Sequence, residues 1–359
     1  MVIKAAAKID HEVDPKKKED MLGLYPNPQN LLEEHATIDT SVLKELSFSS
    51  ILSARMFGKL LFCELCKLAA FLQLKKMPIR DVLYDKIMAA AFFEPSTRTR
   101  LSFESAMLNL GGKTLSVAEA ATTSIAKGES LLDIGQMFNS YADVVVVRHT
   151  EQKALQDLSH YLRIPLINGG NGSDEHPTQA LSDWYALLKW KPEIANSKLE
   201  DSKKLQLGII GTPGNMRSVK SFLILSLLFS ENIKKITIVS EMADPLGEDV
   251  QDFCNKSTIP IDVSNDLQQV VGQLDVLYMN AIAYLGDSYR HLGSQFKLSS
   301  KSGLKKGAVI LHPLARRDEL SMDLDNTDHN LYFNQADGAV FIRQALLLAI
   351  FDRVENNSI

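Results

Sequence analysis

The sequence predicts an α/β protein with two doubly wound parallel-sheet domains joined by helices, and with its functional site between the domains. Short apolar segments without polar alternation recur along the chain, and each is followed by a segment with helical spacing of apolar residues. This pattern is typical of parallel strands that helices cover on both faces. The alternation occurs twice, on either side of a polar linker at 192–204. A length of 359 residues also exceeds what one core of ordinary size holds.

Composition excludes several functional classes. A formal net charge of -5 and a hydrophobic content of 45% give no general basis for binding nucleic acid or an acidic membrane surface. The longest apolar runs are far shorter than the roughly 20 residues that a membrane span needs. The N-terminal segment lacks the apolar region of a secretory signal, so we expect a cytoplasmic protein.

The three cysteines do not suggest a disulfide framework, because their number is odd and no signal peptide is visible. Cys63 and Cys66 form a C-x-x-C pair, which can be half of a zinc site or a redox pair. The apolar residues around them recur at helical spacing, and no second Cys or His pair lies nearby. A buried helix is therefore the favoured interpretation.

The first half of the chain follows a polar extension at residues 1–40. Apolar residues at helical spacing predict its helices, Gly111 and Gly112 end one of them, and continuous apolar runs predict its strands. Helices are expected at 41–73, 97–112, 129–142, 151–162 and 176–191, and strands at 86–93, 113–118, 143–149 and 164–170.

The second half repeats the alternation and ends in a long helix that is expected to be amphipathic. Strands are expected at 205–211, 234–240, 261–264, 275–280 and 307–313, and helices at 215–230, 246–257, 267–273 and 338–355. The predicted domains are 41–185 together with the returning segment 337–359, and 186–336.

Candidate ligand-binding residues follow the predicted strands, and ligands of such sheets bind at the carboxyl ends of the strands. The helix after Phe93 begins within Pro-Ser-Thr-Arg, so its free N–H groups and positive dipole end suit an anion. The fork of an arginine also matches phosphate. This segment therefore suggests a phosphate cradle. In the alternative, Ser96 only caps the helix and Arg98 pairs with Glu94 or Glu104.

Further polar residues follow other strands, and each also has a plainer interpretation. Arg148 could form a surface ion pair, and His176 could be a loop histidine with satisfied hydrogen bonds. A nicotinamide enzyme is disfavoured because Gly208, Gly211 and Gly214 do not form G-x-G-x-x-G, and Glu241 does not fit the ribose position.

Six segments occur in the order found in aspartate carbamoyltransferases, and residues from about 45 to 350 resemble this family within the wider aspartate/ornithine carbamoyltransferase group. The segments are FFEPSTRTRLSFE, KGESLLD, VVRH, HPTQALSD, GNMRSV and HPL. The resemblance implies transfer of a carbamoyl group from carbamoyl phosphate to an amine acceptor. It also implies a carbamoyl-phosphate-binding domain at 41–185 plus 337–359 and an acceptor-binding domain at 186–336.

The resemblance further implies roles for individual residues. Ser96, Thr97, Arg98 and Thr99 would hold the phosphate. Arg148, His176, Gln179 and the backbone carbonyl of Leu314 would hold the carbamoyl group. Lys127 would come from a neighbouring subunit of a homotrimer with shared active sites, and would act in catalysis and in acceptor binding. Arg217 would bind the acceptor's α-carboxylate, and Glu94 would take part in domain closure.

The chemistry of carbamoyl transfer suits these residue types. A neutral amine attacks the carbamoyl carbon, negative charge grows on its oxygen, and phosphate leaves, so the protein needs no nucleophile of its own. Thr99, Arg148 and His176 are natural donors to that oxygen, and removing one such donor typically costs about 3 kcal/mol. The sequence contains no metal-ligand cluster, so neither a metal nor an organic cofactor is expected.

The sequence departs from the family on the acceptor side. Ala281 and Ala283 stand where aspartate enzymes carry the Arg and Gln of Thr-Arg-x-Gln, which hold the aspartate side chain. Ala315 replaces the proline of His-Pro-Leu-Pro, so the Leu314–Ala315 bond either keeps the family's cis form or the loop is rebuilt.

These departures leave the acceptor open between aspartate, for pyrimidine synthesis, and a different amine with one carboxylate. The ornithine branch fits poorly, because its His-Cys-Leu-Pro and Asp-x-Trp-x-Ser-Met-Gly motifs are absent. A non-catalytic or regulatory carbamoyltransferase-like subunit is the alternative from another class. Retention of Arg98, Lys127, Arg148, His176 and Gln179 argues against it.

Overall fold

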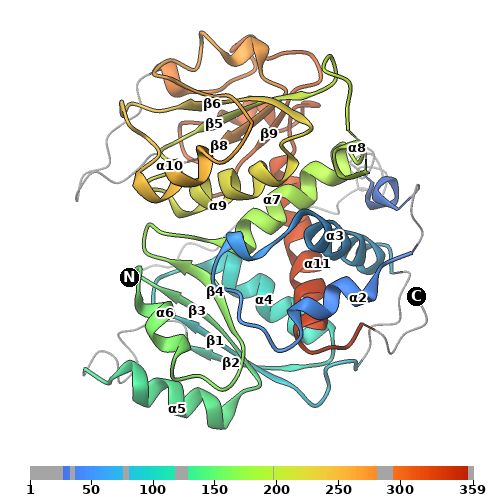
Figure 1. Ribbon diagram of the computed structural model, residues 1–359, viewed down its shortest axis with the longest axis vertical. Helices are drawn as coiled ribbons and strands as arrows, with labels where there is room; N and C mark the ends of the chain where they lie inside the picture. Colours follow the sequence, from blue (N-terminus) through green and yellow to red (C-terminus); the bar gives the residue numbers. More distant parts are fainter. Residues whose placement is uncertain are drawn as a thin grey trace, which may run out of the picture.

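The computed structural model contains two parallel sheets, one in each half of the chain, with helices on both faces of each (Figure 1). It describes residues 27–32, 37–75, 81–117, 128–196, 198–280 and 294–354. The predicted α/β class with two parallel-sheet domains is confirmed. None of the helices in these ranges has the length and apolar character that a bilayer span requires.

The first sheet has the strand order β2-β1-β3-β4 and is parallel throughout. Alternate residues of its strands face opposite sides: Met88 and Ala90 join the core under α4, while Ala89 and Ala91 join the core under α5 and α6. Burial on both faces explains why the two central strands, β1 and β3, are apolar at their centres, whereas the edge strand β2 is mostly exposed and carries polar residues. The strands are β1 (Ile87–Phe92), β2 (Lys113–Val117), β3 (Val144–His149) and β4 (Leu166–Asn171), and the helices are α4 (Thr97–Asn109), α5 (Leu131–Tyr141) and α6 (Ala154–Ser159).

The second sheet has the order β7-β6-β5-β8-β9 and is also parallel. Its strands are β5 (Leu205–Ile210), β6 (Ile233–Val239), β7 (Ile261–Ser264), β8 (Val276–Met279) and β9 (Val309–Leu311). Its helical segments are α9 (Arg217–Ser226), η6 (Leu227–Phe229), α10 (Glu248–Cys254), η7 (Val271–Gln273), η8 (Ser294–Phe296) and η9 (Met322–Leu324).

Each sheet has one point where the strand order reverses, between β1 and β3 in the first and between β5 and β8 in the second. The loops leaving two such neighbouring strands run in opposite directions, and a crevice opens between them. This topology fixes where a ligand can bind in each domain.

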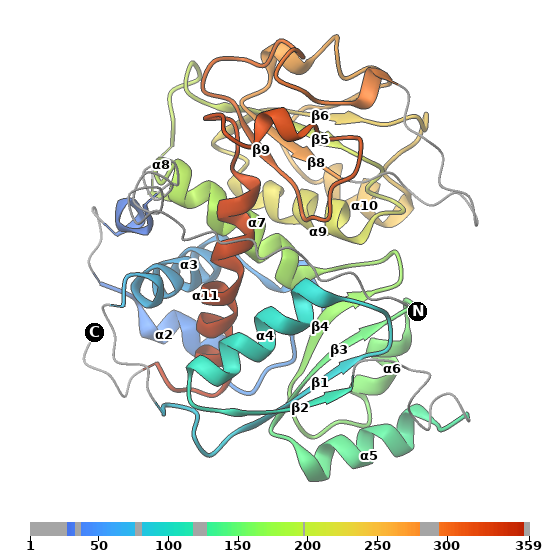
Figure 2. The same ribbon diagram turned by 180° about the vertical axis from the view of Figure 1, so that it is seen from behind.

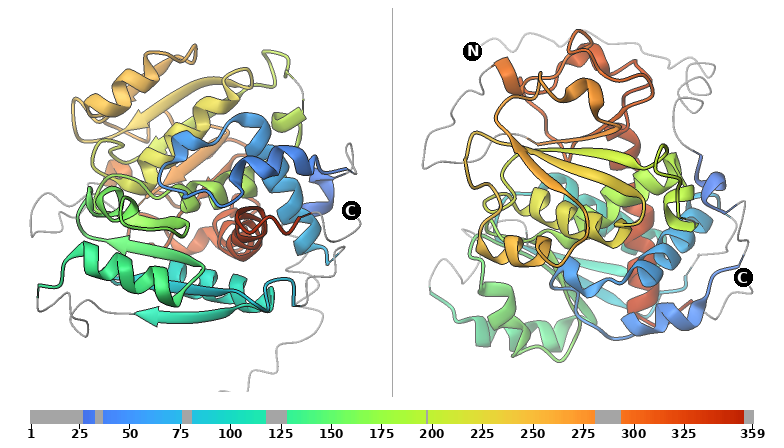
Figure 3. Two further views of the ribbon diagram at one scale, coloured as in Figure 1. Left: turned by 60° about the horizontal axis from the view of Figure 1, so that its bottom comes forward. Right: turned by 45° about the horizontal axis from the view of Figure 1, so that its top comes forward.

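Two long helices run between the sheets, α7 (Pro177–Trp190) and α11 (Tyr332–Ile350) (Figures 1 and 2). Helix α11 packs against α3 (Lys59–Gln73), α4 and α7, and Figure 3 shows it nearly end-on among other helices. The expectation of an amphipathic helix over 338–355 is wrong on two counts. The helix begins at Tyr332, and it is buried around almost its whole circumference because helices enclose it.

The single helix expected at 41–73 is also wrong. The chain forms α2 (Thr40–Leu43), η2 (Lys44–Leu46), an extended piece, η3 (Ala54–Met56) and then α3. The extended piece exists because Ile51 pairs with the edge strand β4: its N–H donates to the Leu166 carbonyl at 2.7 Å, and its carbonyl accepts from Asn168 at 2.8 Å. Here the hydrogen bonds between Ile51 and β4 outweigh the helical spacing of the apolar residues in the sequence.

The structure differs from the sequence prediction in two smaller ways. The helix expected at 267–273 is a turn and the short η7, and the Asp266 side chain accepts from the Gln268 N–H at 2.8 Å in a turn that competes with a helix. The linker 192–204 contains α8 (Glu193–Asn196), and the N-terminal extension contains η1 (Pro28–Leu31).

Cys63 and Cys66 are buried free thiols in α3, which confirms the helical interpretation.

Candidate active site

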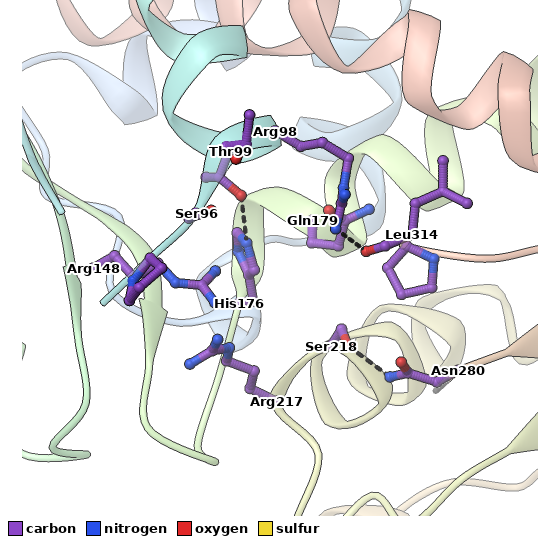
Figure 4. Close-up of a pocket in the computed structure, with 13 residues that line it drawn as sticks. Ser96, Arg98, Thr99, Arg148, His176, Gln179, Arg217, Ser218, Asn280 and Leu314 are labelled. Carbon is purple, nitrogen blue, oxygen red and sulfur yellow. Dashed lines mark hydrogen bonds between the residues drawn. The ribbon is translucent and has the colours of Figure 1, made fainter. Parts of the chain in front are cut away.

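A cavity of about 350 Å³ lies where the switch points of the two sheets face each other (Figure 4). Its walls come from the carboxyl end of β3 and from the segments that follow β1, β4, β5, β8 and β9. Arg98 and Arg148 line this same cavity, although 50 residues separate them in sequence. The lining residues are Pro95, Ser96, Thr97, Arg98, Thr99, Arg148, His176, Gln179, Arg217, Ser218, Asn280, Pro313 and Leu314.

The start of α4 forms one wall. Ser96 occupies the N-cap position, but its side chain makes no capping hydrogen bond. Arg98 donates to the backbone carbonyl of Leu314 across the cavity, whereas Arg100 turns away and pairs with Glu104 at 3.7 Å. The alternative of a mere cap with an Arg98–Glu94 or Arg98–Glu104 pair is therefore wrong, and the helix start faces the cavity.

Thr99 and His176 form a buried polar pair. The Thr99 hydroxyl lies 3.2 Å from His176 Nε2, and the His176 backbone N–H donates to the Ser221 hydroxyl at 2.9 Å. Burial, followed by the charges of Arg148 and Arg217, holds the pKa of His176 well below its ordinary value. The imidazole is therefore neutral at physiological pH, and one of its nitrogens carries a hydrogen that it can donate.

Arg148, Arg217 and Glu94 form an ion cluster that joins the two halves of the molecule. Arg148 lies 2.8 Å from Glu94 Oε1, and Arg217 forms a bidentate pair with both carboxylate oxygens at 2.8 and 2.6 Å. Figure 4 shows Arg148 and Arg217 on one side of His176 and Arg98 reaching toward Leu314 on the other. Glu94 is not among the residues that line the cavity.

The cluster shifts the protonation of its members. Burial and the charge of Arg217 lower the pKa of Arg148 to about 10, against the opposing effect of Glu94, so Arg148 stays charged at neutral pH. Burial would raise the pKa of Glu94, but hydrogen bonds and charge from Arg217 and Arg148 outweigh it, and this pKa lies below its ordinary value.

Gly170 makes room for the two arginines. Its φ of +114° is one that favours glycine, and a Cβ there would lie 3.2 Å from Arg217 Nε and 3.3 Å from Arg148 Nη1. Backbone of the same loop also holds Arg217, since Arg217 Nη1 donates to the Gly172 carbonyl at 2.7 Å.

Gln179 and Leu314 bring neutral polar groups to the cavity. The Gln179 amide nitrogen donates to Asp183 at 2.6 Å, which directs its amide nitrogen away from the cavity. The Leu314–Ala315 peptide bond is cis, so the loop keeps the family's cis form without the proline. His312 lies behind this loop, and its Nδ1 accepts from the Leu314 N–H at 2.8 Å.

Two polar lining residues, Ser218 and Asn280, were missed by sequence reasoning. The Asn280 amide donates to the Ser218 hydroxyl at 2.9 Å, and both side chains lie on the wall formed by the second sheet. Their positions were a usable signal, because Asn280 ends a predicted strand and Ser218 follows Arg217 at the start of a helix. The candidate Lys127 and the departures Ala281 and Ala283 lie outside the described residues.

Three guanidinium groups, a helix start, hydroxyls, a neutral imidazole and an amide thus converge on one small space. Such a set binds a compact dianion and stabilises negative charge that develops on an adjacent oxygen.

Comparison with known proteins agrees with this chemistry. Residues 50–189 match the model of the aspartate/ornithine carbamoyltransferase carbamoyl-P binding domain, and residues 203–350 match that of the Asp/Orn binding domain. The aspartate carbamoyltransferase catalytic subunit of Methanobrevibacter smithii is 36% identical over 281 residues, 77% of this chain and 85% of that protein. The catalytic subunit of Pyrobaculum calidifontis is 35% identical over 84% of this chain and 97% of its own length.

Solved structures give the same result. The aspartate transcarbamoylase of Trypanosoma cruzi, in complex with carbamoyl aspartate and phosphate, superposes with a TM-score of 0.75 at 30% identity, covering 86% of this chain and 97% of that one. The chain described here belongs to the aspartate/ornithine carbamoyltransferase family.

Proposed function

We propose that this protein transfers the carbamoyl group of carbamoyl phosphate to the amine of an amino-acid acceptor. The observation that carries the proposal is that Arg98, Arg148 and His176, from three separate segments, line one cavity beside the start of α4. The names of the relatives, which are aspartate carbamoyltransferases, support the same reaction.

In this proposal the donor side binds carbamoyl phosphate. Ser96, Thr97, Arg98 and Thr99 hold the phosphate at the start of α4, and Arg148, Thr99 and His176 donate to the carbamoyl oxygen. Gln179 and the Leu314 carbonyl accept from the carbamoyl nitrogen. The amine forms a bond to the carbamoyl carbon, the bond to the phosphate oxygen breaks, and the departing phosphate takes the amine's proton.

On the acceptor side, Arg217 binds the α-carboxylate of the acceptor. Its present partner Glu94 reaches it from the other half of the molecule, which supports a role for Glu94 in domain closure. Ser218 and Asn280 add neutral polar groups to this wall.

Aspartate is the first candidate acceptor, because the relatives are named aspartate carbamoyltransferases. A structure of the Trypanosoma cruzi enzyme also contains carbamoyl phosphate and aspartate. Ala281 and Ala283 favour the second candidate, a different amine with one carboxylate, because they replace the family's side-chain clamp. An unpaired second carboxylate in a partly desolvated site costs several kcal/mol.

The acceptor can be identified by measuring phosphate release from carbamoyl phosphate with a panel of amines. Release with aspartate supports the role in pyrimidine synthesis, and release only with another amine supports a specialised transferase. Absence of release with every amine, in protein that binds carbamoyl phosphate, supports a non-catalytic subunit.

We also propose a cytoplasmic homotrimer in which Lys127 completes a neighbour's site. Helix α4 and strand β2 carry exposed leucines, Leu101 at 49%, Leu108 at 58% and Leu115 at 47%, which suits a covered interface. The test is to mix the inactive variants Lys127→Ala and Arg98→Ala after dissociation. Hybrid trimers regain activity if the site is shared, and no activity returns if each chain acts alone.

We further propose that residues 41–185 plus 337–359 form the carbamoyl-phosphate-binding domain and that residues 186–336 form the acceptor-binding domain. The separation of the two sheets supports it, with α7 and α11 as the helices that cross between them.

A further inference from the structure

Asp183 lies beneath the cavity, in the middle of α7, and is fully buried. Its Oδ1 atom accepts hydrogen bonds from two side-chain amides, Gln179 Nε2 at 2.6 Å and Gln335 Nε2 at 2.5 Å. Gln179 lines the cavity, whereas Gln335 belongs to α11. One carboxylate oxygen therefore ties together the two helices that run between the sheets.

The hydrogen bonds continue from Gln335 to the Leu314 loop. The Gln335 Oε1 atom accepts from the His312 N–H at 2.8 Å, and His312 Nδ1 accepts from the Leu314 N–H at 2.8 Å. His312 Nε2 lies 2.9 Å from Glu319, so the ring is held at both nitrogens. A continuous network thus connects the two groups proposed to accept from the carbamoyl nitrogen, Gln179 and the Leu314 carbonyl.

The contribution of Asp183 to the stability of the fold does not by itself explain why a carboxylate is buried here. The Oδ2 atom of Asp183 and the hydroxyl of Tyr278 are both buried, and neither makes a hydrogen bond of ordinary distance and angle within the described part of the chain, although the two groups are close enough to influence each other's pKa. Burial raises the pKa of Asp183 to about 7, although interactions with the side chains of Gln179, Tyr278 and Gln335 and the charge of Arg343 oppose this. Buried polar atoms without partners are destabilising and rare, so such a residue calls for another explanation.

The orientation of Gln179 supplies that explanation. A glutamine amide can present either its carbonyl oxygen or its NH₂ group, and only the carbonyl accepts from the NH₂ of a carbamoyl group. Because Asp183 accepts from Gln179 Nε2, the carbonyl Oε1 is the end left for the cavity. A glutamine that is free to flip would place NH₂ against NH₂ in part of the molecules.

We propose that Asp183 is a positioning residue for carbamoyl recognition, acting through Gln179 directly and through Gln335 and His312 on the Leu314 carbonyl. This inference rests on the proposed function, since it assumes that the ligand is carbamoyl phosphate. Asp183 fixes two carbonyl oxygens that converge on one nitrogen, and it plays no part in binding the phosphate.

The test compares the affinities of carbamoyl phosphate and inorganic phosphate, measured by calorimetry on the full-length protein. We expect Asp183→Leu to weaken carbamoyl phosphate about tenfold, the effect of one lost polar contact, and to change phosphate affinity less than about twofold. Asp183→Asn should restore the preference, because its carbonyl oxygen can accept from both glutamines. In a Gln179→Ala background, Asp183→Leu should have only the smaller effect that passes through Leu314.

A second pair of variants tests the inference if Asp183→Leu does not fold. Gln335→Met breaks the link to His312 and should weaken carbamoyl phosphate about threefold relative to phosphate. Gln344→Met makes the same chemical change on a buried residue of the same helix and should leave both affinities unchanged. Equal weakening of both ligands by Asp183→Leu or Gln335→Met, or no effect from either, overturns the inference. A wild-type protein that does not prefer carbamoyl phosphate to phosphate overturns the proposed function itself.

Discussion

The two walls of the cavity are built in different ways. The wall from the first sheet is dominated by consecutive residues, Ser96 to Thr99, at the start of one helix. The wall from the second sheet takes Arg217, Asn280 and Leu314 from three separate connections. Contiguous residues keep their relative geometry wherever the helix lies, whereas residues on separate loops depend on how each loop packs. In the sequence, the departures Ala281, Ala283 and Ala315 all come from the second half of the chain, and none falls in the contiguous segment that forms the donor wall.

The largest expected effect tests the donor wall. Arg98→Ala removes a cation at the proposed phosphate site and should lower kcat/KM about 10³-fold, in line with the loss of a preorganised donor. Arg100→Ala is the matched control, since Arg100 lies on the same helix turn but pairs with Glu104. Steady-state phosphate release measures both. Similar losses in the two variants would show that the helix start, and not the Arg98 side chain, matters.

The acceptor wall should respond differently. Arg217→Ala should lower kcat/KM for the acceptor about 100-fold, because the acceptor carboxylate loses a bidentate partner. The affinity for carbamoyl phosphate should change less than about threefold. An equal loss for donor and acceptor would mean that Arg217 serves both walls.

Gly170 lies beside Arg148 of one wall and Arg217 of the other, so a substitution at Gly170 should affect both stability and activity. Gly170→Ala forces a strained backbone and crowds Arg148 and Arg217, so we expect about 1–2 kcal/mol of lost stability together with at least tenfold lower activity. Gly303→Ala is the control, because its φ is also positive, at +71°, but its Cβ would have open space. Chemical denaturation and activity should show lost stability in both and lost activity only in Gly170→Ala.

The smallest effect concerns the link between the walls. The pKa of Glu94 in the folded protein lies below the ordinary 4.5, so its contribution is present above about pH 4.5 and is lost as pH falls through the folded pKa. Glu94→Gln should therefore be less stable than wild type by about 1 kcal/mol at pH 7. The difference should shrink as the pH falls below 4.5 in denaturant titrations. A difference that is constant with pH would contradict the ion-pair explanation.

Much of the fold could be predicted from sequence, because buried parallel strands carry their own signature. The four valines at 144–147 allow few alternatives to a strand covered on both faces. Ile51 could not be placed in the same way, since its neighbours have helical spacing and only the edge of β4 draws it into extended pairing. The burial of α11 was likewise invisible, because enclosure depends on three other helices.

The residues of the cavity also divide into those that local sequence identifies and those that depend on tertiary contacts. Ser96, Thr97, Arg98 and Thr99 were identifiable because an anion site at a helix start needs only neighbouring residues. Asn280, Ser218 and Asp183 were missed because their importance lies in partners more than 60 residues away or on another helix.

The sequence by itself determined the alternation of strands and helices, the helix start that suits phosphate and the family to which the chain belongs, because these depend on local pattern. Only the tertiary structure decided that Glu94 binds Arg148 and Arg217, that Arg98 reaches Leu314, and that Asp183 holds Gln179 and Gln335. The physical reason is that a hydrogen bond or ion pair requires two groups within about 3 Å, a condition set by the packing of whole elements.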